Sequence, residues 1–277
     1  RGVDGGGGGG DVVTEAAWTV GGNVQQAAGR ILFEMPANKR LSKWNAYVCS
    51  GTAVTDSQSG QSLVLTAAHC VYDDANKAFA RNVIFIPDQA GTSGSGTDRD
   101  CSNDPIGCWT MNYGVVHTGW STSTFPSNAA WDFGYYVVAT TGQHVAGIGA
   151  ASDSLETAVP ELGVTFSTPS TVQTYALGYS YSQDPSFRYC AELLGEYDAA
   201  DWWLGSCGLS GGSSGGPWIQ SATGAGPVLS VNSWGFTTSP GMAGPKFSGT
   251  SRAQCTYTYA NTVRDFGPAA RGYTTSC

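Results

Sequence analysis

Short runs of apolar and β-branched residues, separated by clusters of Gly, Ser, Asn and Pro, recur along most of this chain. In the first half they include Arg30–Phe33, Ser62–Leu65, Val83–Ile86 and Tyr135–Val138. No stretch of this half shows the period of an amphipathic helix of ordinary length. Short strands separated by turn signals are typical of a β-sandwich or barrel. We therefore predict an all-β fold.

The second half continues the pattern from Thr171–Tyr179, and its only expected helix near the end covers Ala260–Phe266. Between the halves, residues 140–170 show little periodicity, so we interpret them as a crossing between two lobes. The chain length allows two lobes of ~120 residues each. We assign residues 19–150 to a first barrel and residues 151–277 to a second one.

The first 18 residues form a separate segment. They include six consecutive glycines, which carry no side chain to bury. We therefore predict a flexible, Gly-rich N-terminal segment over residues 1–18. No secretion signal opens the chain, and we interpret it as a processed form.

Composition and charge exclude several classes of partner. The formal net charge is −8 and the few Lys and Arg residues are scattered, so we expect no nucleic-acid partner. No run of about 18 apolar residues occurs, so we expect no membrane contact. Eight cysteines, an even number without a CxxC pair, favour an oxidising compartment and argue against zinc. These features predict a secreted, extracellular protein without a metal or cofactor.

Residues 211–217 read Gly-Gly-Ser-Ser-Gly-Gly-Pro. A hydroxyl flanked by glycines suits acyl transfer, because the backbone must turn sharply and direct N–H groups at an oxygen that becomes charged. Ser214 is the candidate nucleophile, and Ser213 is its rival. A flexible turn of the same composition is the alternative interpretation.

Two further motifs provide partners for such a serine. The strand-like run Leu63–Cys70 contains His69, one of only three histidines, and histidine is the usual base near neutral pH. Asp132 opens an aromatic and β-branched run. A carboxylate there is costly unless it is paired, and orienting an imidazole would pair it. The alternatives are a core histidine beside a disulfide and an aspartate that caps a strand.

Four motifs carry a family resemblance: Thr66-Ala-Ala-His69-Cys70, Asp132 before a strand, Gly212–Pro217 and Ser233-Trp-Gly235. Together they resemble the chymotrypsin/trypsin-like serine peptidase family, most closely its secreted microbial branch, over about residues 29–266. The chain order His, Asp, Ser agrees with chymotrypsin and not with subtilisin. The resemblance implies two antiparallel six-stranded Greek-key β-barrels with a short C-terminal helix. It also implies a serine endopeptidase that hydrolyses peptide bonds through a Ser-His-Asp triad and an acyl-enzyme intermediate.

The resemblance implies a role for each residue of the site. His69 would take the proton of Ser214, and Asp132 would fix the tautomer of His69. The backbone N–H groups of Gly212 and Ser214 would form the oxyanion hole. Residues 233–235 would pair with the substrate as an added strand.

The side chain that precedes the cleaved bond needs a pocket. Residues 205–212 contain no acid, so a preference for Arg or Lys lacks its partner carboxylate. A preference for Glu usually uses a histidine where this chain has Asn232. We therefore predict cleavage after uncharged residues. The candidate substrate-binding residues are Ser233, Trp234, Gly235, Gly205, Ser206, Leu209 and Asn232.

The resemblance implies a disulfide between Cys49 and Cys70, next to the candidate base. Short spacing predicts a second one between Cys101 and Cys108. The other four cysteines allow two arrangements, and we favour the first because microbial relatives often bridge the loop before the nucleophile. The arrangements are Cys190–Cys207 with Cys255–Cys277, or Cys207–Cys255 with Cys190–Cys277.

Single features suggest further assignments. Ser213 is uncharged at the position where animal trypsins hold an aspartate for a freed N-terminus, so we expect residues 1–18 to be dispensable for activity. A calcium site in the acidic loop Asp98–Cys108 is a minor alternative. We interpret His117 as scaffold and His144 as exposed.

Two other function classes explain the chain less well. A non-catalytic binding protein on the same fold would normally lack one of the three site residues. A carbohydrate-binding β-domain would explain nine tryptophans but not the histidine and serine motifs. We expect protein or peptide substrates and a monomer.

Overall fold

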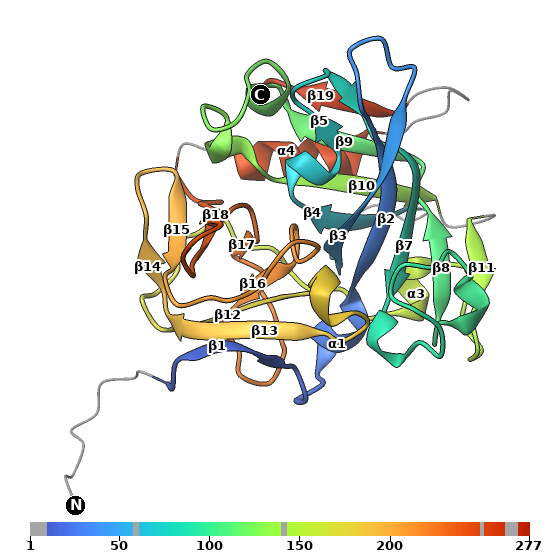
Figure 1. Cartoon of the computed structure of the whole chain (residues 1–277), viewed down its shortest axis with the longest axis horizontal. Helices are drawn as coiled ribbons and strands as arrows, with labels where there is room; N and C mark the ends of the chain where they lie inside the picture. The colour runs from blue at the N-terminus through green and yellow to red at the C-terminus, as the bar shows by residue number, and fades with distance from the viewer. Residues whose placement is uncertain (1–9, 58–60, 140–142, 250–251, 264–270) are drawn as a thin grey trace, which may run out of the picture.

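The computed structural model describes residues 10–57, 61–139, 143–249, 252–263 and 271–277. Within them the chain is mostly β-strand, arranged in three main sheets and one short hairpin (Figure 1). The prediction of an all-β fold is confirmed. Among the described residues, no helix has the length and apolar character needed to cross a membrane.

The largest sheet has nine strands and carries most of the main hydrophobic core. Its central strands are rich in β-branched and aromatic residues, which suit a pleated surface buried by its neighbours. In spatial order the strands are β11 (His144–Ala146), β8 (Gly107–Thr110), β7 (Arg81–Pro87), β2 (Ala28–Pro36), β3 (Trp44–Val54), β4 (Gln61–Thr66), β10 (Gly134–Ala139), β9 (Tyr113–His117) and β19 (Gly272–Thr275). The hairpin of β5 (Tyr72–Asp73) and β6 (Ala78–Phe79) lies beside this sheet.

The second lobe contains a five-stranded and a three-stranded sheet. The five-stranded sheet is ordered β1 (Val13–Ala17), β13 (Arg188–Leu193), β12 (Gln173–Gly178), β16 (Pro217–Ile219) and β17 (Ser230–Val231). The three-stranded sheet is ordered β14 (Gly195–Glu196), β15 (Asp201–Leu204) and β18 (Met242–Pro245). Both sheets pack around a second core cluster that includes Trp202 and Trp218.

Helices are short and connect strands. The described α-helices are α1 (Asn23–Ala27), α2 (Thr118–Ser121), α3 (Leu155–Ala158) and α4 (Ala253–Thr262). Single 3-10 turns are η1 (Ala68–Cys70), η2 (Gln89–Gly91), η3 (Cys101–Asn103), η4 (Ala129–Trp131) and η5 (Tyr181–Gln183). The predicted C-terminal helix, Ala260–Phe266, was placed too late, because α4 has little amphipathic pattern and is stabilised by packing on β9 and β10. Residues 264–266 of that prediction lie outside the described residues.

The two ends of the chain cross to opposite lobes (Figure 1). β1 pairs with β13 in the second lobe, and β19 pairs in parallel with β9 in the first. The prediction of a flexible segment over residues 1–18 is therefore wrong for Val13–Trp18, and its first nine residues lie outside the described part of the chain. Trp18 is only 5% exposed and packs edge-on against Tyr175 and Tyr189. This contact buries a large apolar side chain, which a run of glycines cannot do. The division near residue 150 remains our proposal for the two lobes.

Four disulfides link the described residues, and all agree with the favoured arrangement. They are Cys49–Cys70, Cys101–Cys108, Cys190–Cys207 and Cys255–Cys277. The last of these ties α4 to the end of the chain just after β19.

The burial of Trp18 leads to a stability prediction. Trp18→Ala should lower the free energy of unfolding by ~3–5 kcal/mol, because it leaves a cavity between β1 and two tyrosines. Val20→Ala is the matched control, since Val20 is 56% exposed and its loss should change stability by less than ~0.5 kcal/mol. Denaturant unfolding measures both variants. Equal stability of Trp18→Ala and the wild type would contradict the docking of β1.

Candidate active site

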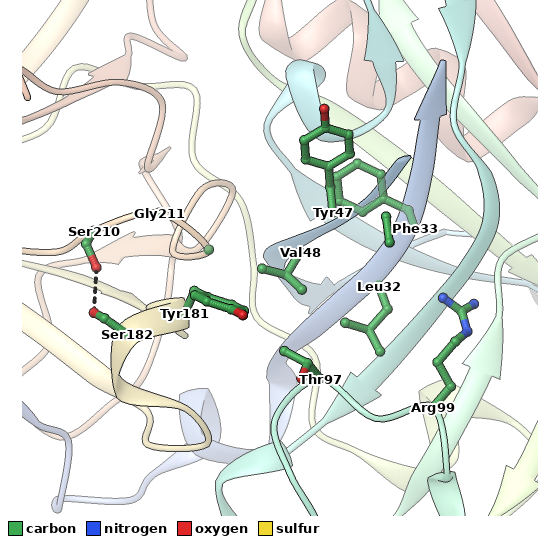
Figure 2. Close-up of a pocket in the computed structure, with 12 residues that line it drawn as sticks. Leu32, Phe33, Tyr47, Val48, Thr97, Arg99, Tyr181, Ser182, Ser210 and Gly211 are labelled. Carbon is green, nitrogen blue, oxygen red and sulfur yellow. Dashed lines mark hydrogen bonds between the residues drawn. The ribbon is translucent and has the colours of Figure 1, made fainter. Parts of the chain in front are cut away.

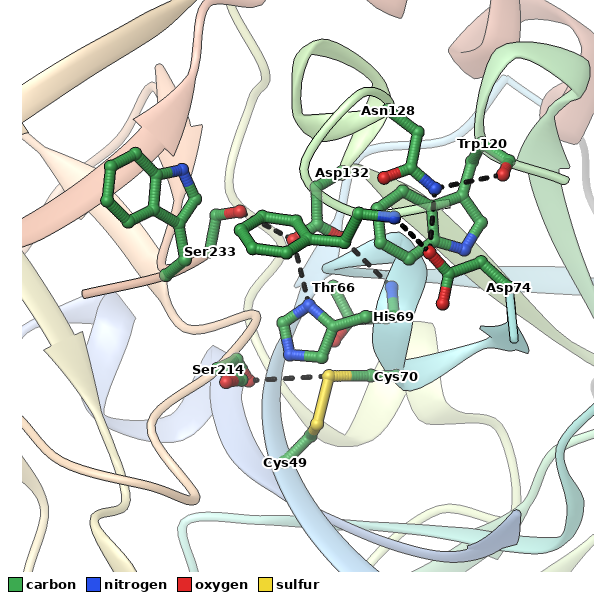
Figure 3. Close-up of polar contacts among 12 residues, drawn as sticks. Cys49, Thr66, His69, Cys70, Asp74, Trp120, Asn128, Asp132, Ser214 and Ser233 are labelled. Atoms are coloured by element: carbon green, nitrogen blue, oxygen red, sulfur yellow. Dashed lines mark hydrogen bonds and ion pairs between the residues drawn. A yellow bond between two sulfur atoms is a disulfide. The ribbon is translucent and has the colours of Figure 1, made fainter. Parts of the chain in front are cut away.

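His69 and Asp132 are brought together by the pairing of two strands. β4 ends at Thr66, whose register partner is Gly134 at the start of β10. Because the strands are antiparallel, the residues just after β4 and just before β10 lie at the same end of the sheet. The backbone N–H of His69 donates to Oδ1 of Asp132 at 2.9 Å, and Nδ1 of His69 lies 2.8 Å from Oδ2 (Figure 3).

Asp132 is a buried carboxylate, only 1% exposed. Its Oδ2 also accepts a hydrogen bond from Oγ of Ser233 at 2.5 Å. Ser233 belongs to the second lobe and His69 to the first, so the carboxylate joins both halves of the molecule. Three donors satisfy the group and compensate for the cost of burying its charge.

The environment of His69 sets its protonation. Burial lowers the pKa of its imidazole, but the charge of Asp132 and the hydrogen bond to it outweigh burial, and the net pKa is raised above the ordinary value. The contact at Nδ1 leaves Nε2 facing the pocket that His69 shares with Ser214. Within the described residues, no hydrogen bond joins Nε2 to Oγ of Ser214.

Ser214 lies in the loop of residues 211–216, which we call the serine loop. Its conformation requires glycine on both sides of Ser214. Gly212 has φ +97° and Gly215 has φ +81°, values that other residues rarely adopt. A Cβ on Gly215 would collide with Oγ1 of Thr66, so the loop sits directly against the end of β4. The N–H of Ser50 on β3 donates to the carbonyl of Ser214 at 2.7 Å, which fixes the loop to the first lobe.

Ser213, the rival nucleophile, faces the interior. It is 1% exposed, and its hydroxyl donates to the carbonyl of Ser210 at 2.7 Å. The backbone N–H groups of Gly212 and Ser214 donate to no acceptor in the described part of the chain.

A pocket of about 500 Å³ opens on one side of Ser214. Four of the predicted substrate-binding residues line it, namely Leu209, Ser233, Trp234 and Gly235. Sequence reasoning missed the part of its wall that comes from residues 236–237 and 239–242, with Phe236 and Met242 as its larger side chains. All of the lining residues are uncharged.

The other three predicted pocket residues lie outside this lining, and their placement is corrected. Asn232 is fully buried, donates to the carbonyls of Leu177 and Ser213 at 2.9 Å, and accepts from the Trp218 indole. It therefore supports the serine loop from behind, because its amide can satisfy three backbone and side-chain groups at once.

Gly205 packs under the Trp203 ring, and the N–H of Ser206 donates to Glu192.

Asp201 does not line this pocket, although it contacts Trp234, which does. It is 1% exposed and accepts a hydrogen bond from the Trp234 indole at 3.2 Å. Burial raises the pKa of its carboxyl to about 7. The carboxyl is therefore bonded to a side chain of the pocket wall and is not itself part of the wall.

Two pockets lie on the opposite side of the serine loop. A pocket of about 340 Å³ contains His69 and Ser214, and a larger one of about 690 Å³ reaches Gly211 and Gly212. Figure 2 shows the larger one, with Val48 between Tyr47 and Tyr181 and Leu32 beside Val48. Phe33, Tyr47 and Val48 line both, so the two pockets form one surface.

The other histidines have structural contacts. His117 accepts a hydrogen bond from the Gly119 N–H at 2.8 Å, in agreement with a scaffold role. His144 was predicted to be exposed, and this is wrong. Its side chain is 4% exposed, because it stacks on Trp109 with ring centroids 4.2 Å apart and bonds the Ile106 carbonyl.

Comparison with known proteins identifies the class of this chain. No known family profile and no curated protein matches the sequence. Among solved structures, it is similar to the protease Anisep from Arthrobacter nicotinovorans, with 28% identity and a TM-score of 0.66 over 86% of this chain and 96% of that one. The thermostable serine protease AL20 from an extremophilic microorganism matches with 25% identity and a TM-score of 0.66, over 87% of this chain and 99% of that one.

A Glu endopeptidase shares the fold at 16% identity, with a TM-score of 0.60 over 90% of this chain and 97% of that one. The fold and these likenesses define the class as the chymotrypsin-like serine proteases. The resemblance to Anisep and AL20 in both fold and sequence indicates a serine endopeptidase.

The environment of His69 leads to a titration prediction. NMR of the His69 ring should give a pKa above 6.5, and Asp132→Asn should lower it, because burial then acts without the opposing charge. Asp153→Asn beside His144 is the control and should leave the His69 pKa unchanged. Because the folded-state pKa is raised, protonated His69 stabilises the fold below its unfolded pKa, and this contribution disappears as pH rises through the folded pKa. A His69 pKa at or below 6.5 in the wild type would contradict the dominance of Asp132.

Proposed function

We propose that this chain is a secreted serine endopeptidase that uses Ser214, His69 and Asp132 as a catalytic triad. The observation that carries the proposal is the buried Asp132 carboxylate, which holds Nδ1 of His69 at 2.8 Å while Nε2 faces the pocket of Ser214. Ser214 is partly exposed and lines the pocket that contains His69, whereas Ser213 is 1% exposed and its hydroxyl bonds the Ser210 carbonyl, and this contrast supports Ser214 as the nucleophile.

In the proposed reaction, Nε2 of His69 accepts the proton of Ser214 as Oγ attacks the peptide carbonyl carbon. The carbonyl π electrons move to oxygen, and the N–H groups of Gly212 and Ser214 bind the resulting oxyanion. The C–N bond then breaks, and the leaving amine takes the proton from His69. Water repeats the sequence on the acyl-enzyme and releases the acid, which regenerates Ser214.

Asp132 keeps the proton on Nδ1 of His69, so that Nε2 is free to act as the base. The hydroxyl of Ser233 shares the same carboxylate oxygen and limits its rotation. Ser214 Oγ and Nε2 need to approach only when substrate is bound, since catalytic hydrogen bonds commonly tighten in the Michaelis complex.

The substrate chain before the cleaved bond would lie along Ser233–Gly235. The carbonyl of Ser233 and both backbone groups of Gly235 make no hydrogen bond within the described residues, so they can pair with an added strand. Its last side chain would enter the uncharged pocket beside Leu209 and Met242. We therefore propose cleavage after uncharged, apolar or aromatic residues.

The chain after the cleaved bond would cross to the surface between Tyr47 and Tyr181. The floor of this surface is formed by Leu32, Phe33 and Val48. Such a floor favours apolar side chains in the part of the substrate that follows the cleaved bond. Four disulfides and the low content of charged residues support a secreted, monomeric enzyme.

The triad predicts a contrast between the two adjacent serines. Ser214→Ala should abolish both peptide hydrolysis and labelling by a fluorophosphonate, while the protein stays folded, because only the nucleophilic oxygen is lost. Ser213→Ala is the matched control and should keep both activities, since its hydroxyl only bonds the Ser210 carbonyl. Asp132→Asn should fold but lose about ten-thousandfold in turnover, because His69 then holds the wrong tautomer. Labelling of Ser214→Ala at the wild-type rate would reject the triad.

Pocket chemistry predicts the residue preference. In a peptide library, kcat/KM for Phe or Leu before the cleaved bond should exceed that for Lys, Arg or Glu by about 100-fold, because the pocket offers no partner for a buried charge. Tyr47→Ala, on the other side of the serine, should leave this ratio unchanged. A dominant preference for Lys, Arg or Glu would mean that another surface receives this side chain.

A further inference from the structure

The serine loop is supported by two buried side chains of the first lobe. Arg30 on β2 and Ser50 on β3 are direct register partners, and each is at most 1% exposed. Oγ of Ser50 donates to the carbonyl of Gly212 at 2.9 Å and accepts from the N–H of Tyr179 at 2.9 Å. Nη1 of Arg30 donates to the carbonyls of Tyr179 at 2.5 Å and Gly212 at 3.5 Å.

Arg30 is a buried cation with a specific counterion. Its guanidinium forms an ion pair with Asp184, whose side chain is 12% exposed, and Nε faces the side-chain oxygen of Gln89 at 3.4 Å. Burial lowers the pKa of Arg30 to about 10, so the group stays charged at neutral pH. A buried charge of this kind is tolerated only with a partner and further hydrogen bonds, which are present here.

Arg30 therefore holds both ends of the segment 179–184. It bonds the Tyr179 carbonyl at one end and the Asp184 carboxylate at the other, with its guanidinium carbon 5.5 Å from the centre of the Tyr179 ring. Between these anchors, the N–H of Tyr181 donates to the carbonyl of Gly211 at 2.7 Å. The segment is thus fixed against the serine loop at its midpoint.

This last hydrogen bond orients the neighbouring N–H group. In a planar trans peptide the C=O and N–H point in opposite directions. When the Gly211 carbonyl is held by Tyr181, the N–H of Gly212 in the same peptide points away from Tyr181, where it meets no acceptor within the described residues. A Cβ on Gly212 would contact Tyr179, Tyr181 and Arg30 at 2.8–2.9 Å, so the packing around this peptide is tight.

We propose that Arg30, paired with Asp184, is a positioning residue that aims the N–H of Gly212 at the oxyanion of the substrate. It acts through the segment 179–184, which holds the Gly211–Gly212 peptide in one orientation. The uncharged Ser213 offers no ion pair within the loop, and Arg30 supplies from the first lobe the anchor that the loop itself lacks. The inference rests on the proposed function, because it assigns a role in the same reaction.

The alternative is that Arg30 only ties the two lobes together. The two roles differ in kinetics. A lost structural tie reduces the fraction of folded enzyme, whereas a misaimed N–H lowers the rate of each folded molecule and leaves ground-state binding intact. Measurement of kcat and KM on enzyme titrated with a fluorophosphonate separates these cases.

The test uses the whole chain with Arg30→Met, Arg30→Lys and the double variant Arg30→Met/Asp184→Leu. The double variant removes both charges and avoids an unpaired buried carboxylate. Lysine keeps the charge for Asp184 but lacks the planar fork that also reaches the carbonyls. Arg188→Met is the matched control, because Arg188 also pairs across the chain, with Glu15 at 3.4 Å, but outside the serine loop.

We expect kcat of the folded methionine variants to fall about 10- to 100-fold, with KM within about twofold of wild type. This loss in kcat should not exceed the loss caused by removing an oxyanion-hole donor entirely. Arg30→Lys should lose less. Affinity for a peptide boronate, which places an oxygen in the oxyanion hole, should fall in parallel with kcat, while inhibition by the cleaved peptide product should not change. Arg188→Met should match the wild type in all three measurements.

A titrated Arg30→Met or double variant with wild-type kcat and boronate affinity would overturn the inference. The inference would also be overturned if the activity of these variants fell only in proportion to the fraction of folded enzyme. These results leave the triad intact, provided that the wild type hydrolyses peptides and Ser214→Ala does not. A wild type that reacts with neither peptide nor fluorophosphonate would reject the proposed function itself.

Discussion

The buried carboxylate of Asp132 is the interaction on which the site depends. A charge that is 1% exposed in a β-rich core is stable only if donors surround it, and here they come from His69 in one lobe and Ser233 in the other. The same hydrogen bonds that satisfy the charge also fix the imidazole and bring the two lobes into register. Stability and site geometry therefore have a common origin at this group.

The serine loop shows the complementary arrangement, in which the first lobe satisfies the backbone of the second. The N–H and hydroxyl of Ser50 bond the carbonyls of Ser214 and Gly212, and Thr66 fills the space beside Gly215. Asn232 supports the loop from the other side through the Ser213 carbonyl. Positive φ values at these two positions are tolerated because glycine has no Cβ, and the close contacts around both positions would exclude one. The loop is thus shaped by contacts from both lobes.

The exchange of chain ends extends this dependence to the whole fold. β1 completes the edge of the second lobe and its Thr14 carbonyl accepts from Gly208, next to the pocket residue Leu209. α4 and β19 complete the first lobe, joined by the Cys255–Cys277 disulfide. Each lobe therefore uses strands from the opposite end of the sequence. This connection is why the N-terminal strand, expected to be dispensable, belongs with the scaffold of the pocket.

The sequence alone determined the all-β class and the residues with distinctive chemistry, since His69, Asp132 and Ser214 each stand in a local motif. For four of the eight cysteines it left two arrangements open, and the structure decided between them. The sequence also determined that the pocket loop carries no acid. Only the tertiary structure decided the place of β1, the pocket wall at residues 236–237 and 239–242, the inward turn of Asn232 and the contact of Arg30 with the serine loop. These features arise from contacts between residues far apart in the chain, and such contacts leave no period or motif in the local sequence.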